Sequence, residues 1–121
     1  MLTFDALRMA NVYRLQNTPK FKECLTWSRA EWVQALTGEL GEAANVSKKI
    51  SRGDYTLDEK RHDFSHELAD VAIYLDLLAF VCDINLEVAI VEKFNDVSQR
   101  VSSKARLNHT VGFYLEERNS R

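Results

Sequence analysis

The sequence predicts an all-α protein of the four-helix-bundle type, which is completed by oligomerisation. Proline occurs once and glycine four times in 121 residues, so few breaks interrupt long helices. Apolar residues recur at helical spacing in four long segments. With 45% hydrophobic and 28% charged residues, the composition is that of a globular protein. The length favours a single domain spanning residues 1–121.

The first two helices are delimited by recognisable start and stop residues. The first helix is predicted over residues 4–16, because Pro19 restricts the residue before it to extended backbone. The second is predicted over residues 28–52. Ser28 is followed three residues later by a glutamate, which is the pattern of a capping box, and Gly53 provides a C-terminal stop.

The third and fourth helices are predicted over residues 57–81 and 86–104. The stretch 71–81 is apolar on nearly every face, as in a helix buried on most sides. Three neighbouring helices in so short a chain cannot cover it, so we expect a homo-oligomer, a tetramer being favoured over a dimer. The core of the domain is expected at about 27–104, followed by a C-terminal arm at 107–121. Partial order in this arm is expected from Val111, Phe113 and Tyr114.

Two acidic pairs interrupt the apolar stripes of the second and third helices. They are Glu39 with Glu42, and Glu67 with Asp70. The i, i+3 spacing places both carboxylates of a pair on one helix face. Four carboxylates converging from two helices repel one another unless a cation lies between them. All-oxygen ligands suit Mg²⁺, so the sequence predicts a metal site.

Glycines and cations near these pairs carry further expectations. Gly38 and Gly41 lie inside the second helix, where glycine is unfavourable, and predict a close approach of a neighbouring helix or ligand; simple tolerance is the alternative. Lys93 and Arg100 lie beside the apolar stripe of the fourth helix. Their side chains either reach a phosphate chain or extend into solvent.

The chain resembles a known enzyme family in several strings of residues. These are ALTGELGEAAN (35–45), Lys48-Lys49, ELADVAIYLD (67–76), Lys93-Phe94-Asn95 and Ser98. They are similar to the MazG-like, all-α nucleoside triphosphate pyrophosphohydrolases in their compact single-domain form, over roughly residues 27–100. Two positions depart from the family pattern. Gly38 replaces the first acid of the signature, and Val97 replaces an asparagine for which Asn95 or Ser98 would substitute.

The resemblance implies Mg²⁺-dependent hydrolysis of (deoxy)nucleoside triphosphates to the monophosphate and pyrophosphate, with removal of unwanted dNTPs as its purpose. Mn²⁺ would substitute for Mg²⁺. The implied catalytic and metal-binding residues are Glu39, Glu42, Glu67 and Asp70. The candidate substrate-binding residues are Lys49, Tyr74, Lys93, Trp27, Asn95 and Arg100. Trp27 and the nearby Trp32 either stack on a base or pack in the core.

Other classes of protein are less consistent with the sequence. A formal net charge of −2 provides no basic field for nucleic acid. No apolar run reaches the roughly 18 residues of a membrane span, and the first residues do not resemble a secretory signal. Cys24 and Cys82 are expected to be buried thiols, which is typical of a cytoplasmic protein.

Two alternatives to the enzyme remain from the residues themselves. A ferritin-like di-iron protein needs two Glu-x-x-His motifs, and this chain has one, Glu59-x-x-His62, with His66 one turn later. Both histidines are expected at the surface or in an interface. The second alternative is a non-catalytic, helical, oligomeric interaction or regulatory module with a structural metal site.

Overall fold

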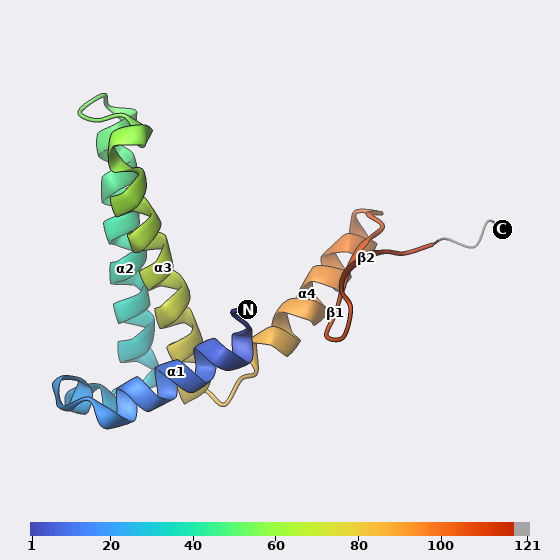
Figure 1. Ribbon diagram of the computed structural model, residues 1–121, viewed down its shortest axis with the longest axis horizontal. Helices are drawn as coiled ribbons and strands as arrows, with labels where there is room; N and C mark the ends of the chain where they lie inside the picture. The colour runs from blue at the N-terminus through green and yellow to red at the C-terminus, as the bar shows by residue number, and fades with distance from the viewer. Residues whose placement is uncertain (118–121) are drawn as a thin grey trace. The chain divides into compact units, whose positions relative to one another are not determined.

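A computed structural model describes residues 1–117 and is mostly helical, with a small two-stranded sheet (Figure 1). The elements in chain order are α1 (Phe4–Asn17), the 3-10 helix η1 (Pro19–Thr26), α2 (Arg29–Ser51), α3 (Leu57–Val81), α4 (Leu86–Arg100), β1 (Ala105–Asn108) and β2 (Gly112–Leu115). The chain forms two compact units, Met1–Asp83 and a second unit that starts at Ile84.

In the first unit, α2 and α3 lie side by side as an antiparallel hairpin (Figure 1). The predicted capping box of α2 is confirmed, because the Ser28 hydroxyl accepts from the Glu31 N–H at 3.2 Å and the Glu31 carboxylate accepts from the Ser28 N–H at 3.2 Å. Thr56 and Glu59 form a second such box on α3. Gly53 has a φ of 89°, which ends α2 as predicted.

A small core joins α1 to the hairpin. Leu15, Trp32 and Leu77 come from α1, α2 and α3 and form one buried cluster. α1 lies across the end of the hairpin opposite the α2–α3 turn (Figure 1). The apolar contact of the three helices holds α1 against this end of the hairpin.

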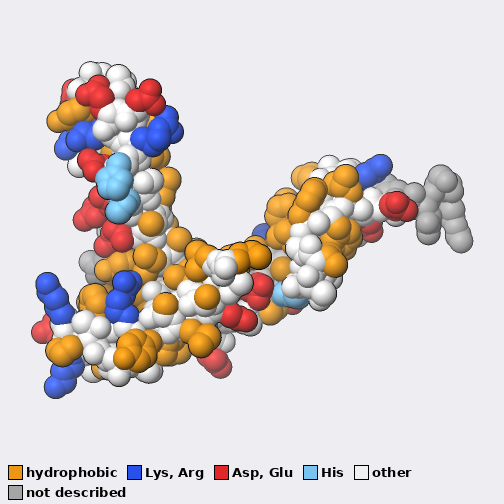
Figure 2. Space-filling view, in the orientation of Figure 1, with side chains coloured by type: hydrophobic (Ala, Val, Ile, Leu, Met, Phe, Trp, Pro, Cys, Tyr) orange, Lys and Arg blue, Asp and Glu red, His pale blue; other side chains and the backbone are white. Residues whose placement is uncertain are grey.

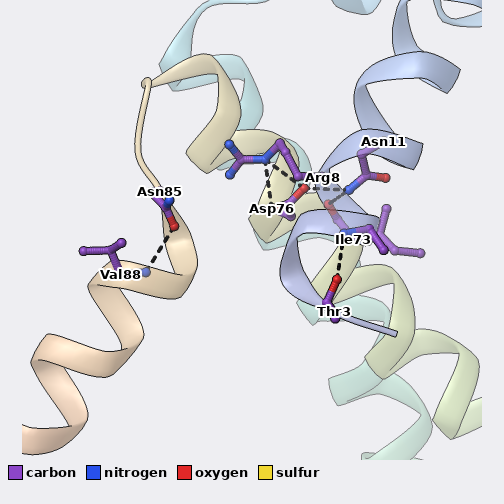
Figure 3. A network of polar contacts seen from close by, with 8 residues as sticks. Thr3, Arg8, Asn11, Ile73, Asp76, Asn85 and Val88 are labelled. Atoms are coloured by element: carbon purple, nitrogen blue, oxygen red, sulfur yellow. Dashed lines mark hydrogen bonds and ion pairs between the residues drawn. The ribbon is translucent and has the colours of Figure 1, made fainter. Parts of the chain in front are cut away.

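A buried polar network also connects α1 to α3 (Figure 3). Asp76 is 1% exposed, and its two oxygens accept from the Arg8 Nε at 3.1 and 3.2 Å. The Asn11 amide donates to Asp76 at 3.0 Å and to the Ile73 carbonyl at 3.3 Å. The sequence analysis treated Asp76 as part of an apolar run; the structure shows that a cation and an amide compensate its burial.

The second unit consists of α4 and a β-hairpin. Asn85 caps α4 by accepting from the Val88 N–H at 3.1 Å (Figure 3). The prediction that this helix continues to residue 104 is wrong, because Ser102 adopts a φ of 59° and the Ser103 N–H bonds to the Ser98 carbonyl at 2.8 Å. Such a left-handed residue stops helical propagation.

Part of the predicted C-terminal arm is a regular structure. Strands β1 and β2 are antiparallel, with Ala105 opposite Leu115 and Asn108 opposite Gly112. The mostly helical character of the chain is confirmed, and this hairpin adds a small sheet that the sequence analysis did not predict. Residues 118–121 of the arm lie outside the described residues.

Within one chain, α3 is less buried than its composition predicts. Leu68 is 48% exposed and Leu75 is 39% exposed. Cys24 and Cys82 carry free thiols that are half-buried instead of fully buried. None of the helices in residues 1–117 combines the length and the apolar character needed to cross a membrane.

Candidate functional site

The α2–α3 hairpin brings the two predicted acidic pairs together. Glu39 from α2, and Glu67 and Asp70 from α3, each offer one carboxylate oxygen within 4.8 Å of the other two. All three side chains are half-buried. We call these three residues the acidic cluster. Antiparallel pairing explains the geometry, because it sets the middle of α2 against the middle of α3.

Glu42, the fourth predicted carboxylate, borders the acidic cluster and does not join its closest group. It is exposed, yet its charge is one of the causes that raise the pKa values of Glu39 and Glu67. Of the predicted four-carboxylate cage, three members therefore form the closest group, and the fourth, Glu42, interacts with two of them.

The acidic cluster concentrates negative charge in a partly dry setting. Burial raises the pKa of Glu39 above its ordinary value, and the neighbouring Glu42, Asp70 and Glu67 raise it further. Burial also raises the pKa of Glu67, with Glu42 as the next cause. Such shifts mean that ionising the cluster costs free energy in the protein without a cation.

One oxygen of the cluster lacks a partner. Glu67 Oε2 is buried and has no hydrogen-bond partner among the described residues. A buried oxygen of this kind is costly unless a donor or a cation satisfies it. The donor set consists only of carboxylates, and hard dications such as Mg²⁺ and Mn²⁺ prefer these ligands. The residues therefore fit the predicted ion.

An aromatic group lies on the α1 side of the acidic cluster. Tyr74 follows Asp70 by one turn of α3; burial raises the pKa of Tyr74, and Glu39 is the next cause. The ring centroid of Trp32 is 6.2 Å from that of Tyr74 and 4.9 Å from that of Trp27. Trp32 is 2% exposed, which agrees with core packing, whereas Trp27 is half-buried.

A cavity of about 50 Å³ adjoins these rings and is lined by Trp27, Trp32 and Tyr74 among others. Trp32 Nε1 is buried without a hydrogen-bond partner among residues 1–117. The cavity is mostly apolar, with polar groups of Asn11, Arg14 and Tyr74 also at its wall.

A larger cavity of about 340 Å³ lies on the opposite side, towards the α2–α3 turn. Glu67 lines it together with the predicted Lys49 and with Lys60, a cation that the sequence analysis did not consider. The Lys60 ammonium lies 4.2 Å from the Tyr55 ring centroid and 3.5 Å from an Asp63 oxygen. Lys60 could have been identified from its spacing in the sequence, because it precedes Glu67 by seven residues, or two helical turns.

The predicted substrate-binding residues of α4 belong to the second unit. Lys93 and Arg100 are exposed, and their role in substrate binding stays a prediction. The Asn95 amide donates to the Leu107 carbonyl at 2.9 Å and accepts from the Leu107 N–H at 2.8 Å. The structure thus uses this side chain to attach β1 to α4, and Ser98, its suggested substitute, is buried.

The two glycines beside the acidic pairs have open space around them. A Cβ added at Gly38 or Gly41 would meet no atom of the described chain within 4 Å. The predicted close approach of a neighbouring helix is therefore wrong within the described chain, and the close approach of a ligand stays a prediction beside simple tolerance.

Comparison with models of known protein families gives no match. Comparison with curated proteins gives no match either.

Proposed function

We propose that this protein is a Mg²⁺-dependent nucleoside triphosphate pyrophosphohydrolase of the MazG-like type, acting on (deoxy)nucleotides in the cytoplasm. The observation that supports the proposal most is the acidic cluster. Three half-buried carboxylates from two helices lie within 4.8 Å of one another, and one of their oxygens is buried without a partner. Repulsion of this kind serves little purpose in a purely structural hairpin.

In this proposal, Glu39, Glu67 and Asp70 would hold Mg²⁺, and Mn²⁺ would substitute for it. When bound, the ion would neutralise phosphate charge and polarise the α-phosphorus. Glu42 lies outside the closest group and is exposed, so its carboxylate is available to accept a proton from the attacking water. Water adds at the α-phosphorus. The bond from this phosphorus to the α–β bridging oxygen breaks, and the β- and γ-phosphates leave as pyrophosphate.

The two cavities beside the acidic cluster support this assignment of substrate. Lys49 and Lys60 line the larger one, next to Glu67, and their charges would neutralise the leaving phosphates. Tyr74 and Trp27 line the smaller, aromatic cavity; its volume of about 50 Å³ is below that of a nucleobase, so a base would stack on these rings instead of entering it. A chain with cations on one side of a metal site and aromatic rings on the other provides partners for both ends of a nucleotide.

We also propose that the functional form is a homo-oligomer, either a dimer or a tetramer. The support is exposed apolar surface on α3 and α4. Leu68 and Leu75 on α3, and Phe94 and Val97 on α4, are 36–48% exposed. Apolar residues at helical spacing with this exposure are typical of surfaces that another subunit covers.

The test measures pyrophosphate release from a panel of canonical and modified dNTPs and NTPs, with Mg²⁺, with Mn²⁺ and with EDTA. Glu67→Gln is the inactive variant, and Glu92→Gln, an exposed acid on α4, is the matched control. Metal-dependent release that Glu67→Gln abolishes and Glu92→Gln preserves supports the enzyme. Folded protein that releases no pyrophosphate from any nucleotide would instead favour the non-catalytic interaction module.

A further inference from the structure

Two histidines on α3 form a close pair that the proposed reaction does not use. His62 and His66 are four residues apart, and their ring centroids are separated by 4.2 Å at an interplanar angle of 44°. Both side chains are exposed. In Figure 2, pale-blue histidine side chains lie beside acidic side chains along the α2–α3 hairpin. The i, i+4 spacing on a regular helix keeps both rings on one face.

This arrangement has the dimensions of a bidentate metal chelate. Zinc–nitrogen bonds are about 2.0–2.1 Å long, and tetrahedral coordination then separates two ligand nitrogens by about 3.3 Å. The centroids of the two rings are 4.2 Å apart, which is close to this separation. The same i, i+4 spacing of histidines provides two zinc ligands on the helix of many metalloproteases.

The chemistry of the pair differs from that of the acidic cluster. Imidazole nitrogens favour Zn²⁺, Ni²⁺ and Cu²⁺, whereas carboxylate oxygens favour Mg²⁺ and Mn²⁺. Because both rings are exposed, an ion can bind them while keeping water in its remaining positions. Asp63 lines the same cavity as the two histidines and is paired with Lys60.

We infer that His62 and His66 form a second metal site beside the acidic cluster, in the cavity that Glu67 also lines, which binds a nitrogen-preferring dication such as Zn²⁺ or Ni²⁺. The observations that carry it are the chelating separation of the rings, their exposure and their position on one rigid helix. The inference does not depend on the proposed hydrolase activity. It concerns binding, and a failure of the enzyme assay leaves it unaffected.

The test is isothermal titration calorimetry with ZnCl₂ on the intact protein and on single variants. His62→Ala and His66→Ala should each weaken Zn²⁺ binding by about a hundredfold, since a chelate loses the high effective concentration of its second ligand. His109→Ala is the matched control, because His109 is the third histidine of the chain and lies in the β-hairpin unit; it should bind as the wild type does. Circular dichroism verifies that each variant is folded.

Two further measurements separate this site from others. Glu67→Gln should leave Zn²⁺ affinity at the histidine pair unchanged, and a loss there would assign zinc to the acidic cluster instead. The electron paramagnetic resonance spectrum of the Cu²⁺ complex should show hyperfine coupling to two imidazole nitrogens. Unchanged Zn²⁺ affinity in both His62→Ala and His66→Ala, or a Cu²⁺ spectrum without two such nitrogens, would overturn the inference.

Discussion

Replacing Glu39 with glutamine should stabilise the metal-free protein and remove much of the stabilisation by Mg²⁺. Glu39 approaches Asp70 and Glu67 within 4.8 Å. Two unit charges at that distance repel by about 0.9 kcal/mol in bulk water and by about 3.5 kcal/mol at an effective dielectric constant of about 20. Because Glu39 is half-exposed, solvent screening favours the lower value. We therefore expect Glu39→Gln to add about 1 kcal/mol in EDTA, or about 4 °C in melting temperature for a chain of this length.

The pH dependence gives a second readout of the same repulsion. The pKa of Glu39 is raised in the folded protein, by burial first and by Glu42, Asp70 and Glu67 next. Between the ordinary value of 4.5 and the raised value, the folded state holds a proton that the unfolded state has lost. Stability in EDTA should therefore fall as the pH rises through this window, and Glu39→Gln should flatten that slope.

Mg²⁺ should act in the opposite direction. The ion needs ionised carboxylates, so its stabilising effect should grow with pH; at a hundred times its dissociation constant it contributes about 2.7 kcal/mol. Thermal melts by circular dichroism, in EDTA and in saturating Mg²⁺, measure each of these quantities. Glu92→Gln is the control and should change none of them. If Glu39→Gln lowers the melting temperature in EDTA, or if Mg²⁺ stabilises it as much as the wild type, the reasoning about the acidic cluster is wrong.

Three further predictions concern residues that shape the two units. Asp76→Ala should cost about 3 kcal/mol in urea unfolding because it removes the buried carboxylate that accepts from the Arg8 and Asn11 side chains, whereas the exposed Asp58→Ala should cost about 0.5 kcal/mol; equal effects would argue against the buried network. Thr56→Ala should cost about 1 kcal/mol through loss of the capping box, and no change in the urea midpoint would contradict that. Asn95→Ala should abolish hydrogen-exchange protection of the Leu107 amide, which bonds to the Asn95 side chain at 2.8 Å. Retained protection would show that β1 is stable without this hydrogen bond.

Much of the helical fold was predictable because local signals determine it. The third helix has the predicted bounds, 57–81, and the capping box at Ser28 and the stop at Gly53 are both present. These features depend on residues a few positions apart. The hairpin of β1 and β2 was not predicted, since strands of four residues are too short for an alternating pattern to stand out.

The convergence of the acidic residues was predictable, and their surroundings were less so. Acids that interrupt an apolar stripe are visible in the sequence, and the spacing of Glu39, Glu67 and Asp70 was sufficient to propose their convergence. The buried pairing of Asp76 with Arg8 was not, because it joins positions 68 residues apart and no local pattern encodes such a contact. Lys60 was missed for a different reason: its distance to Glu67 along the helix is visible, but the cavity they share appears only once α2 packs against α3.

The sequence analysis did not predict a metal site at the histidine pair, because it considered a different spacing. His62 lies three residues after Glu59, which is the i, i+3 spacing of a di-iron ligand pair, and a di-iron site needs a second copy of that motif. At i, i+4 the same residue pairs with His66, and His66 is in turn four residues before Asp70. A helix places residues four apart about 40° from one another around its axis, so α3 presents two imidazoles and then a carboxylate along one side. Imidazole nitrogens and carboxylate oxygens prefer different ions. If both proposals hold, the histidine pair should therefore select Zn²⁺ or Ni²⁺, and the acidic cluster should select Mg²⁺ or Mn²⁺.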